Sequence, residues 1–463
     1  MKRALLPVMA LLAACAERPG FDLTSPSLDT LGKTLPTGFL FGTATSAHQT
    51  EGGNVNDWTD FEQGTYPDGR PHITNGDQSG LADDSWNRFD EDLALMQALG
   101  VTAYRFSIEW SRLEPEEGVW NAQAMARYRE WAVKLRAAGI EPSVTLFHFS
   151  LPRWVAAKGG LERPEVADDF AAYARRVGTE LGDVVDFWCP INEINIVAAE
   201  GWLVGDFPPG NTGDTATRAR VMAILLHAHA KMAKALREVD VVDANGDGKA
   251  TLITTAHHVR IFQPATHSAL DTAIAGLTDD FENEAVPRAF ATGHIALTVP
   301  GTIDLQEDVP DLKGSIDVLG LNYYTRDIIR ADLGSASLST MHYRAGRPTN
   351  DQGWDLYPDG LYILLKRFSA YGWPIYILEN GLSDQEGTKR SLFLEQHVAA
   401  LERAVDEGVD VRGYFHWSLM DNFEFADGFW PRFGLYSVDY ANDRKRTATP
   451  AVATFKRISQ NLR

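Results

Sequence analysis

Cysteine is almost absent from this sequence. The chain of 463 residues has only two cysteines, Cys15 and Cys189. Two cysteines so widely spaced provide neither a disulfide framework nor a metal-binding cluster. Cys189 stands in the apolar run DFWCP, where we predict a small buried core residue.

Basic residues are outnumbered by acidic ones. The chain has 43 Lys and Arg against 63 Asp and Glu, which gives a formal net charge of −20. It also lacks the runs of about five or six like charges that mark interaction tails. Binding to nucleic acid or to an anionic membrane surface requires a basic face, so the composition argues against both partners.

The apolar stretch at the N-terminus is too short to span a bilayer. It runs for 11 residues, from Ala4 to Ala14, directly after Lys2 and Arg3. A short basic segment followed by a short apolar one is typical of a secretory signal. The sequence LAAC that ends at Cys15 resembles a bacterial lipoprotein signal, in which cleavage precedes a lipidated cysteine.

This N-terminus predicts an exported protein with three parts. We expect a signal peptide over residues 1–14, a flexible tether over 15–35 that starts at a lipidated Cys15, and a single domain over 36–463. The location would be the bacterial cell envelope, with membrane contact only through the lipid. A general secretory signal with an incidental cysteine is the alternative.

Short apolar runs recur along the rest of the chain, and we interpret eight of them as strands. They are GFLFGTAT from Gly38, AYRFSIEW from Ala103, EPSVTLFH from Glu141, DFWCPINE from Asp186, TLITTAHH from Thr251, DVLGLNYY from Asp317, PIYILENG from Pro374 and VRGYFHWS from Val411. Segments with helical patterns separate them, such as FDEDLALMQALG from Phe89 and RYREWAVKLRAAG, which ends at Gly139. Apolar strands that alternate with helices predict an α/β fold, and eight such units predict one closed (β/α)₈ barrel, a TIM barrel.

Polar side chains stand at the ends of several predicted strands. Because active sites of (β/α)₈ barrels form where the strands end, these residues should meet at one rim. Glu193 ends the fourth strand and Glu379 the seventh, which places two carboxyl groups across one barrel mouth. Such a pair serves glycoside hydrolysis, with one group protonated and the other ionised. Arg105, within the second strand, could help to keep one of them ionised.

Several motifs in the same order identify a resemblance to glycoside hydrolase family 1, the β-glucosidase and β-galactosidase family. It covers the chain from about Leu35 to the C-terminus. The motifs are FLFGTATSAHQTEG, YRFSIEWSR, LFHFSLP, the Asn192–Glu193 pair, LGLNYYT, LENG and GYFHWSLMDNFEFADGFWPRFGLYSVDY. The resemblance implies a retaining, exo-acting β-glycosidase that uses two glutamates and no cofactor, and whose partner is a small β-glycoside or oligosaccharide.

The resemblance also implies a role for each matching position. Glu193 corresponds to the acid/base and Glu379 to the nucleophile, with Arg105 and Tyr324 beside the nucleophile. The expected substrate-binding residues are Gln49, His148, Asn192, Asn322, Trp354, Trp417, Glu424 and Phe433. Gln and His each offer hydrogen-bonding groups in fixed geometry, and a carboxylate such as Glu424 can accept from two neighbouring sugar hydroxyls.

Some positions depart from the family pattern. Phe149 and Phe425 stand where the family commonly has Trp, and each loses an indole N–H donor near the sugar site. Leu378, where the family prefers Thr, predicts a change in packing behind the nucleophile. The reaction type is unaffected, whereas the sugar stays open: glucose is the default, followed by galactose and fucose, with mannose as a further option. A non-catalytic sugar-binding barrel and a transglycosidase remain as alternatives.

The segment DANGDGKAT carries a weak calcium motif. Asp243, Asn245 and Asp247, followed by Gly248, match the opening of an EF-hand loop, but Thr254 takes the place of the closing Glu. A plain turn before the fifth strand is the favoured alternative. The neighbouring pair of histidines after that strand has no further metal ligand at a suitable spacing, which favours a structural or loop role.

Overall fold

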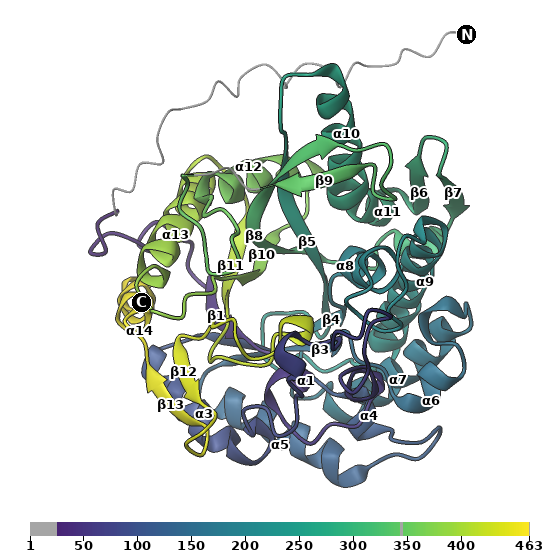
Figure 1. Cartoon of the computed structure of the whole chain (residues 1–463). Coiled ribbons are helices and arrows are strands. Elements are labelled where there is room, and N and C mark those ends of the chain that lie inside the picture. Colours follow the sequence, from purple (N-terminus) through teal and green to yellow (C-terminus); the bar gives the residue numbers. More distant parts are fainter. Residues whose placement is uncertain (1–25, 343–345, 463) are drawn as a thin grey trace, which may run out of the picture.

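A closed barrel of parallel strands forms the centre of the protein (Figure 1). The computed structural model describes residues 26–342 and 346–462. Its main sheet has nine strands, of which all except β9 run parallel, and pairing of β10 with β8 closes the ring. The eight barrel strands are β1 (Leu40–Ala44), β2 (Ala103–Ser107), β3 (Glu141–Phe147), β4 (Phe187–Ile191), β5 (Leu252–Pro264), β8 (Val318–Ala331), β10 (Ile375–Asn380) and β11 (Val411–Trp417). The predicted fold and all eight predicted strands are confirmed.

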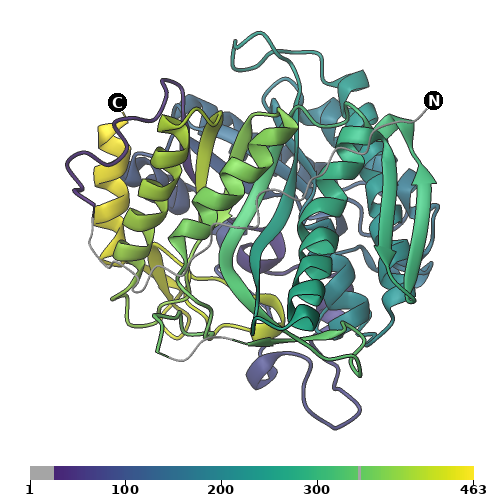
Figure 2. The same cartoon turned by 90° about the horizontal axis from the view of Figure 1, so that it is seen from above.

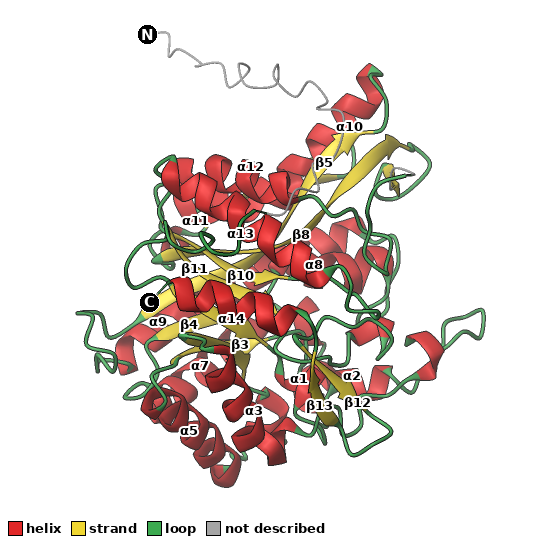
Figure 3. Cartoon of the chain, turned by 90° about the vertical axis from the view of Figure 1, so that its left-hand side faces the viewer, coloured by secondary structure: helices red, strands yellow, loops and turns green. Residues whose placement is uncertain are grey.

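Helices surround the barrel, and Figure 3 shows them outside the strands. The longer ones are α3 (Ser85–Leu99), α5 (Ala122–Ala137), α7 (Val166–Leu181), α9 (Thr215–Val239), α10 (Ala269–Asp279), α11 (Ala285–Thr292), α12 (Pro358–Phe368), α13 (Arg390–Asp406) and α14 (Ala451–Asn461). The short ones are α1 (Ala47–Thr50), α2 (Asp57–Phe61), α4 (Trp110–Leu113), α6 (Arg153–Ala157) and α8 (Ile194–Ala199). The left-handed residues Gly100 and Gly139 follow α3 and α5, as the sequence predicted for helix ends.

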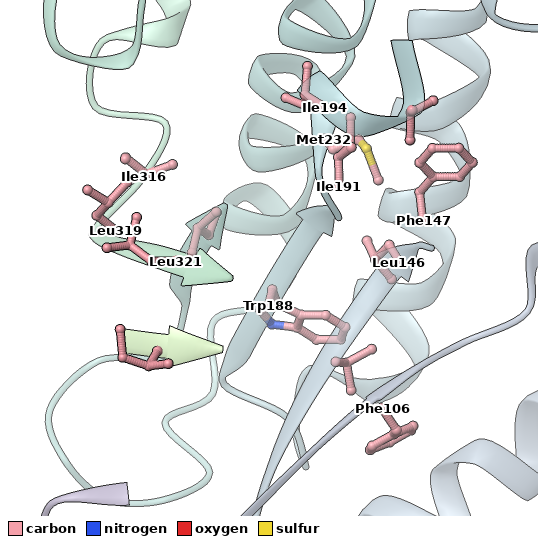
Figure 4. Packing of buried hydrophobic residues seen from close by; sticks show 14 of the residues in the cluster. Phe106, Leu146, Phe147, Trp188, Ile191, Ile194, Met232, Ile316, Leu319 and Leu321 are labelled. Atoms are coloured by element: carbon pink, nitrogen blue, oxygen red, sulfur yellow. The ribbon is translucent and has the colours of Figure 1, made fainter. Parts of the chain in front are cut away.

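The barrel strands bury both of their faces, which explains why their sequences are apolar throughout. Figure 4 shows the outer layer, where Leu146 of β3 and Trp188 and Ile191 of β4 pack beneath the helices together with Met232 of α9. A second cluster fills the interior and includes Cys189, which is buried as predicted. Burial of this kind on both faces is typical of parallel sheets.

Leu378 belongs to the interior cluster. It lies with Phe187, Ala256 and Phe415, and its side chain is completely buried. The backbone of Gly320 on the neighbouring strand β8 comes so close that a Cβ atom there would lie 2.3 Å from Leu378 Cδ1. Leu378 therefore fills the barrel beneath the strand ends.

Two hairpins and one added strand lie outside the barrel and were not predicted. Strands β6 (His294–Val299) and β7 (Ile303–Asp308) form a hairpin at the edge of the helical ring (Figure 2). Strands β12 (Tyr436–Asp439) and β13 (Lys445–Ala448) form the other hairpin, and β9 (Ser339–His342) pairs with the end of β8. All are antiparallel and half-exposed, so they lack the continuous apolar pattern that marks the barrel strands.

The predicted tether ends too late. Leu31 is 2% exposed and belongs to the main core. Asn461 of α14 donates to the carbonyl oxygens of Leu28 and Leu31, at 2.8 and 2.7 Å. Glu402 of α13 accepts from the Gly32 amide at 2.7 Å. Residues 28–35 are thus part of the folded domain. The predicted signal peptide (1–14) and Cys15 lie outside the described residues.

Within residues 26–342 and 346–462, the helices are all too short or too polar to serve as a membrane span.

Candidate active site

Glu379 reaches the barrel mouth because its strand is irregular. Alternation along β10 would place it on the outer face with Ile375 and Ile377, which belong to the core beneath the helices. The register shifts here, however, because Ile377 pairs with Leu321 of β8 and Glu379 pairs with the very next residue, Asn322. Such a bulge redirects the side chains that follow it. The Glu379 carboxyl group therefore joins the inward-pointing residues of the neighbouring strands.

Two donors hold this carboxyl group. Arg105 Nη1 donates to Glu379 Oε1 at 2.5 Å, and the Tyr324 hydroxyl donates to Oε2 at 2.6 Å. Both donors are buried, and so is Glu379, which is 4% exposed. Hydrogen bonds from a guanidinium and a phenol stabilise the ionised form of a carboxyl group.

Arg105 connects three strand ends. Besides Glu379, its guanidinium donates from Nη2 to Asn192 Oδ1 at 2.6 Å and from Nε to Thr145 Oγ1 at 3.0 Å. Its side chain is 1% exposed. Because a guanidinium is planar and always charged, these bonds fix the Asn192 amide with its nitrogen turned away from Arg105.

Glu193 stands at the start of α8 in a strained conformation. Its φ of 48° and ψ of 61° are left-handed, which costs a non-glycine residue about 1–3 kcal/mol and is typical of functional sites. Its Oε1 accepts a hydrogen bond from Asn322 Nδ2 at 2.8 Å and lies 3.0 Å from His258 Nδ1. The surroundings of the two glutamates thus differ: an arginine and a tyrosine hold Glu379, whereas an amide and an imidazole hold Glu193.

The two carboxyl groups influence each other's titration. Burial raises the pKa of Glu379 to about 7, and the nearby Glu193 carboxylate adds to the rise. The positive charge of Arg105 acts in the opposite direction and lowers this pKa. Burial also acts to raise the pKa of Glu193, whereas a charge on His258 lowers it below its ordinary value. Groups coupled in this way titrate as a pair. Arg105 and Tyr324 both favour the ionised form of Glu379, and their hydrogen bonds oppose the effect of burial on its pKa.

Polar groups converge on the opposite side of the mouth. Glu424 Oε2 accepts from Gln49 Nε2 and its Oε1 from Trp417 Nε1, each at 3.2 Å. Asn422 Oδ1 accepts from the same Gln49 nitrogen at 2.8 Å. Burial raises the pKa of Glu424 to about 8, and its bond with Trp417 opposes the rise. The His148 ring stacks on that of Trp417, with centroids 5.8 Å apart.

Three of the predicted substrate-binding residues keep an unused polar atom. Asn192 Nδ2, Asn322 Oδ1 and His148 Nδ1 are buried and have no hydrogen-bond partner among the described residues. Burial lowers the pKa of His148 well below its ordinary value, so its ring is neutral and offers one donor and one acceptor. Buried polar atoms without partners are costly in most proteins, and at a ligand site they supply contacts for the ligand.

Aromatic rings line the rest of the mouth. Trp354 and Phe433 both meet the Tyr324 ring edge-on, with centroids 6.0 and 6.2 Å away. The predicted catalytic, nucleophile-orienting and substrate-binding residues therefore all lie at the barrel mouth. Phe149 and Phe425, where the family commonly has Trp, both adopt positive φ angles, of 77° and 51°, and their rings pack together at 5.1 Å.

No specific role was predicted for His258 or Arg260, yet both belong to the site. His258 contacts Glu193, and Arg260 Nε donates to His258 Nε2 at 2.8 Å. A signal was present, because His258 ends the fifth predicted strand and lies on the same rim as the other polar residues. Its neighbour His257 points to the other face, where Nε2 meets the Asn283 carbonyl oxygen at 3.0 Å.

The acidic loop before β5 is a turn. Asp243 Oδ1 accepts from the Gly246 amide at 2.7 Å, Asn245 Oδ1 from the Asp247 amide at 2.9 Å and Asp247 Oδ1 from the Lys249 amide at 2.9 Å. These side chains satisfy the backbone of their own loop, which is typical of Asx turns. Among the described residues, His, Cys, Asp and Glu nowhere group in threes that could hold a metal ion. The calcium hypothesis therefore gains no support.

Known proteins resemble this chain in both sequence and fold. The family model for Glycosyl hydrolase family 1 matches residues 31–462. Beta-glucosidase A from Thermotoga maritima is 33% identical over 436 residues, covering 89% of this chain and 95% of that protein. The structure of the Thermotoga maritima beta-glucosidase in complex with glucoimidazole superposes with a TM-score of 0.83 at 31% identity, covering 93% of this chain and 99% of that one. A beta-glycosidase from Pyrococcus horikoshii gives 0.83 at 34% identity, with 93% and 96% covered.

The chain therefore belongs to glycosyl hydrolase family 1. Its closed barrel and its site together define an O-glycosyl hydrolase. Within this class it is a retaining β-glycosidase of the β-glucosidase type.

Proposed function

We propose that Glu379 is the nucleophile and Glu193 the acid/base in the hydrolysis of terminal, non-reducing β-linked sugars. The observation that supports this assignment is the pair of bonds from Arg105 and Tyr324 to Glu379, which favours its ionised form. Glu193 Oε1 instead accepts a hydrogen bond from the neutral Asn322 amide at 2.8 Å. We expect a carboxyl separation of ~5–5.5 Å, because a retaining enzyme needs no room for a water between its carboxyl groups.

The reaction proceeds in two displacements. A Glu379 carboxylate oxygen attacks the anomeric carbon while the bond to the leaving oxygen breaks, and Glu193 gives its proton to that oxygen. Water then attacks the anomeric carbon of the glycosyl-enzyme, Glu193 takes a proton from the water, and the ester bond to Glu379 breaks. The sugar leaves in the β-configuration, and both glutamates return to their starting states.

Removal of the acid/base should affect substrates according to their leaving groups. In Glu193→Ala, we expect kcat/KM to fall by about 10²–10⁴-fold for an alkyl β-glucoside, which needs a proton, and only slightly for 2,4-dinitrophenyl β-glucoside. Azide should speed turnover and yield the β-glycosyl azide, because it can attack the covalent intermediate without a base. In Glu379→Ala, azide should instead give the α-glycosyl azide. The opposite pairing of variants and products would exchange the two roles.

We propose glucose as the preferred sugar. The support comes from the beta-glucosidase names of the relatives and from the convergence of Gln49, Trp417 and Glu424, which can contact neighbouring equatorial hydroxyls. Asn192 Nδ2, buried and without a partner among the described residues, is suited to an equatorial 2-hydroxyl.

A set of p-nitrophenyl β-glycosides tests this preference. We expect kcat/KM to be highest for the glucoside, lower for the galactoside and fucoside, and about ten- to a hundredfold lower for the mannoside, whose axial 2-hydroxyl leaves Asn192 unpaired. Glu379→Gln serves as the inactive control. A mannoside that outperforms the glucoside would refute glucose as the preferred sugar.

We also propose export and attachment by lipid at Cys15. The support is the basic, apolar and LAAC segments of the first 15 residues. In a bacterial host given labelled palmitate, the full chain should carry label and sediment with membranes, whereas Cys15→Ser should lose the label. An unlabelled wild-type chain would leave a general secretory signal as the explanation.

A further inference from the structure

His258 and Arg260 lie on the same face of β5, two residues apart, so strand geometry brings their side chains together at the barrel mouth. Arg260 Nε donates to His258 Nε2 at 2.8 Å, and His258 Nδ1 lies 3.0 Å from Glu193 Oε1. The three side chains therefore form a chain of hydrogen bonds from the guanidinium to the carboxyl group. His258 and Glu193 are both 6% exposed, so water competes little with these bonds.

The contact with Arg260 determines the tautomer of His258. A guanidinium in a protein is always charged and only donates, so His258 Nε2 must accept and cannot carry a proton. The one imidazole proton is then on Nδ1, and His258 is neutral. Its Nδ1–H donates to Glu193 Oε1, which also accepts from Asn322 Nδ2 at 2.8 Å. With Oε1 occupied by two donors, a proton on Glu193 belongs on Oε2.

We propose that Arg260 is a positioning residue that keeps the proton shared by His258 and Glu193 on Glu193 Oε2, where the leaving group can receive it. Arg260 acts through His258, by occupying the nitrogen that would otherwise accept this proton. The inference rests on the proposed role of Glu193 as the acid.

Without Arg260, the shared proton would move to the wrong residue. Histidine ordinarily has a pKa about two units above that of glutamate, so in an isolated pair the imidazolium–carboxylate form predominates by about a hundredfold. A positive charge next to a carboxyl group favours its ionised form. Glu193 would then face the substrate as a carboxylate, with no proton to give.

Arg260 is itself held in place. Its Nη1 donates to Asp327 Oδ2 at 3.0 Å, and Asp327 is completely buried. The guanidinium also lies 6.0 Å from the centroid of the Trp354 ring. Because Asp327 offsets the charge of Arg260, the arginine directs the proton mainly through the tautomer of His258 rather than through its own field.

Other titratable groups lie near the hydrogen-bonded set formed by Arg260, His258 and Glu193. They are His257 on β5, Tyr324 and Asp327 on β8, Arg105 on β2, Glu379 on β10 and Glu200, which follows α8. Burial lowers the pKa of His257 to about 4, so it stays neutral at working pH. Burial and the neighbouring carboxylates raise the pKa of Tyr324 well above its ordinary value, so it keeps its proton. Of the two histidines on β5, only His258 contacts Glu193.

The test uses Arg260→Gln in the full enzyme at pH 7. We expect kcat/KM for an alkyl β-glucoside to fall at least thirtyfold, and that for 2,4-dinitrophenyl β-glucoside to change less than threefold. The alkaline limb of the kcat/KM profile for the alkyl substrate should move to higher pH, because the imidazolium–carboxylate pair holds its proton more tightly. Nitrogen NMR of His258 should change from a neutral Nδ1–H ring in the wild type to an imidazolium in the variant.

Two further variants serve as controls. Arg260→Lys also presents only donors to His258 Nε2 and should recover much of the lost activity. His258→Asn/Arg260→Gln replaces the imidazole by an amide that can donate to Glu193 but binds no proton, so it should be more active on the alkyl substrate than Arg260→Gln alone. That recovery would also show that the Arg260→Gln fold is intact.

The inference is overturned if Arg260→Gln slows both substrates equally, if the double variant gains nothing, or if His258 is already an imidazolium in the wild type. The Glu193→Ala experiment separates this failure from failure of the proposed function. A leaving-group effect in Glu193→Ala without one in Arg260→Gln removes only the role of Arg260. If Glu193→Ala itself shows no dependence on the leaving group, the role of Glu193 as the acid is refuted.

Discussion

The buried ion pair between Arg105 and Glu379 is the interaction on which the rest of the site depends. The guanidinium is 1% exposed, so its desolvation must be offset by contacts inside the protein, and it donates to acceptors from three different strands. Removing one partner of a buried pair typically costs about 3–5 kcal/mol. The closed barrel is what brings β2, β3, β4 and β10 close enough to complete this set of bonds.

The same constraint separates the two glutamates. A bulge in β10 turns the Glu379 side chain toward Arg105. The left-handed conformation of Glu193 at the start of α8 directs its own side chain toward Asn322 and His258. One carboxyl group therefore meets a cation and a phenol, and the other meets an amide and an imidazole. Two chemically identical side chains thus have different hydrogen-bond partners, and a retaining glycosidase requires its two carboxyl groups to differ in protonation.

The sequence predicted the barrel and the strand-end residues of its rim because both follow from local patterns, whereas Gln49, Trp354, Glu424 and Phe433 were predicted only through the family resemblance. Apolar runs marked each strand, and a polar residue at a strand end marked the rim. The bulge at Leu378 and the left-handed turn at Glu193 could not be predicted in this way, because each depends on pairing with a distant strand. The docking of Leu31 and Gly32 was missed for the same reason: the partner of Leu31 on α14 and that of Gly32 on α13 are more than 300 positions away.

The contact between His258 and Glu193 shows a second limit of sequence reasoning. The histidine was visible at the end of its strand, but its tautomer depends on Arg260, and the position of Arg260 depends on Asp327 of a neighbouring strand. A chain of three contacts across two strands leaves no periodic pattern in the sequence.

The central claim, that Arg105 and Tyr324 prepare Glu379 for covalent attack, is tested most directly by trapping the intermediate. The enzyme should be inactivated by a 2-deoxy-2-fluoro-β-glucosyl fluoride, which forms the glycosyl-enzyme but hydrolyses slowly. Peptide mapping by mass spectrometry should then find the fluorosugar on Glu379. A label on Glu193, or turnover without any covalent adduct, would contradict the account.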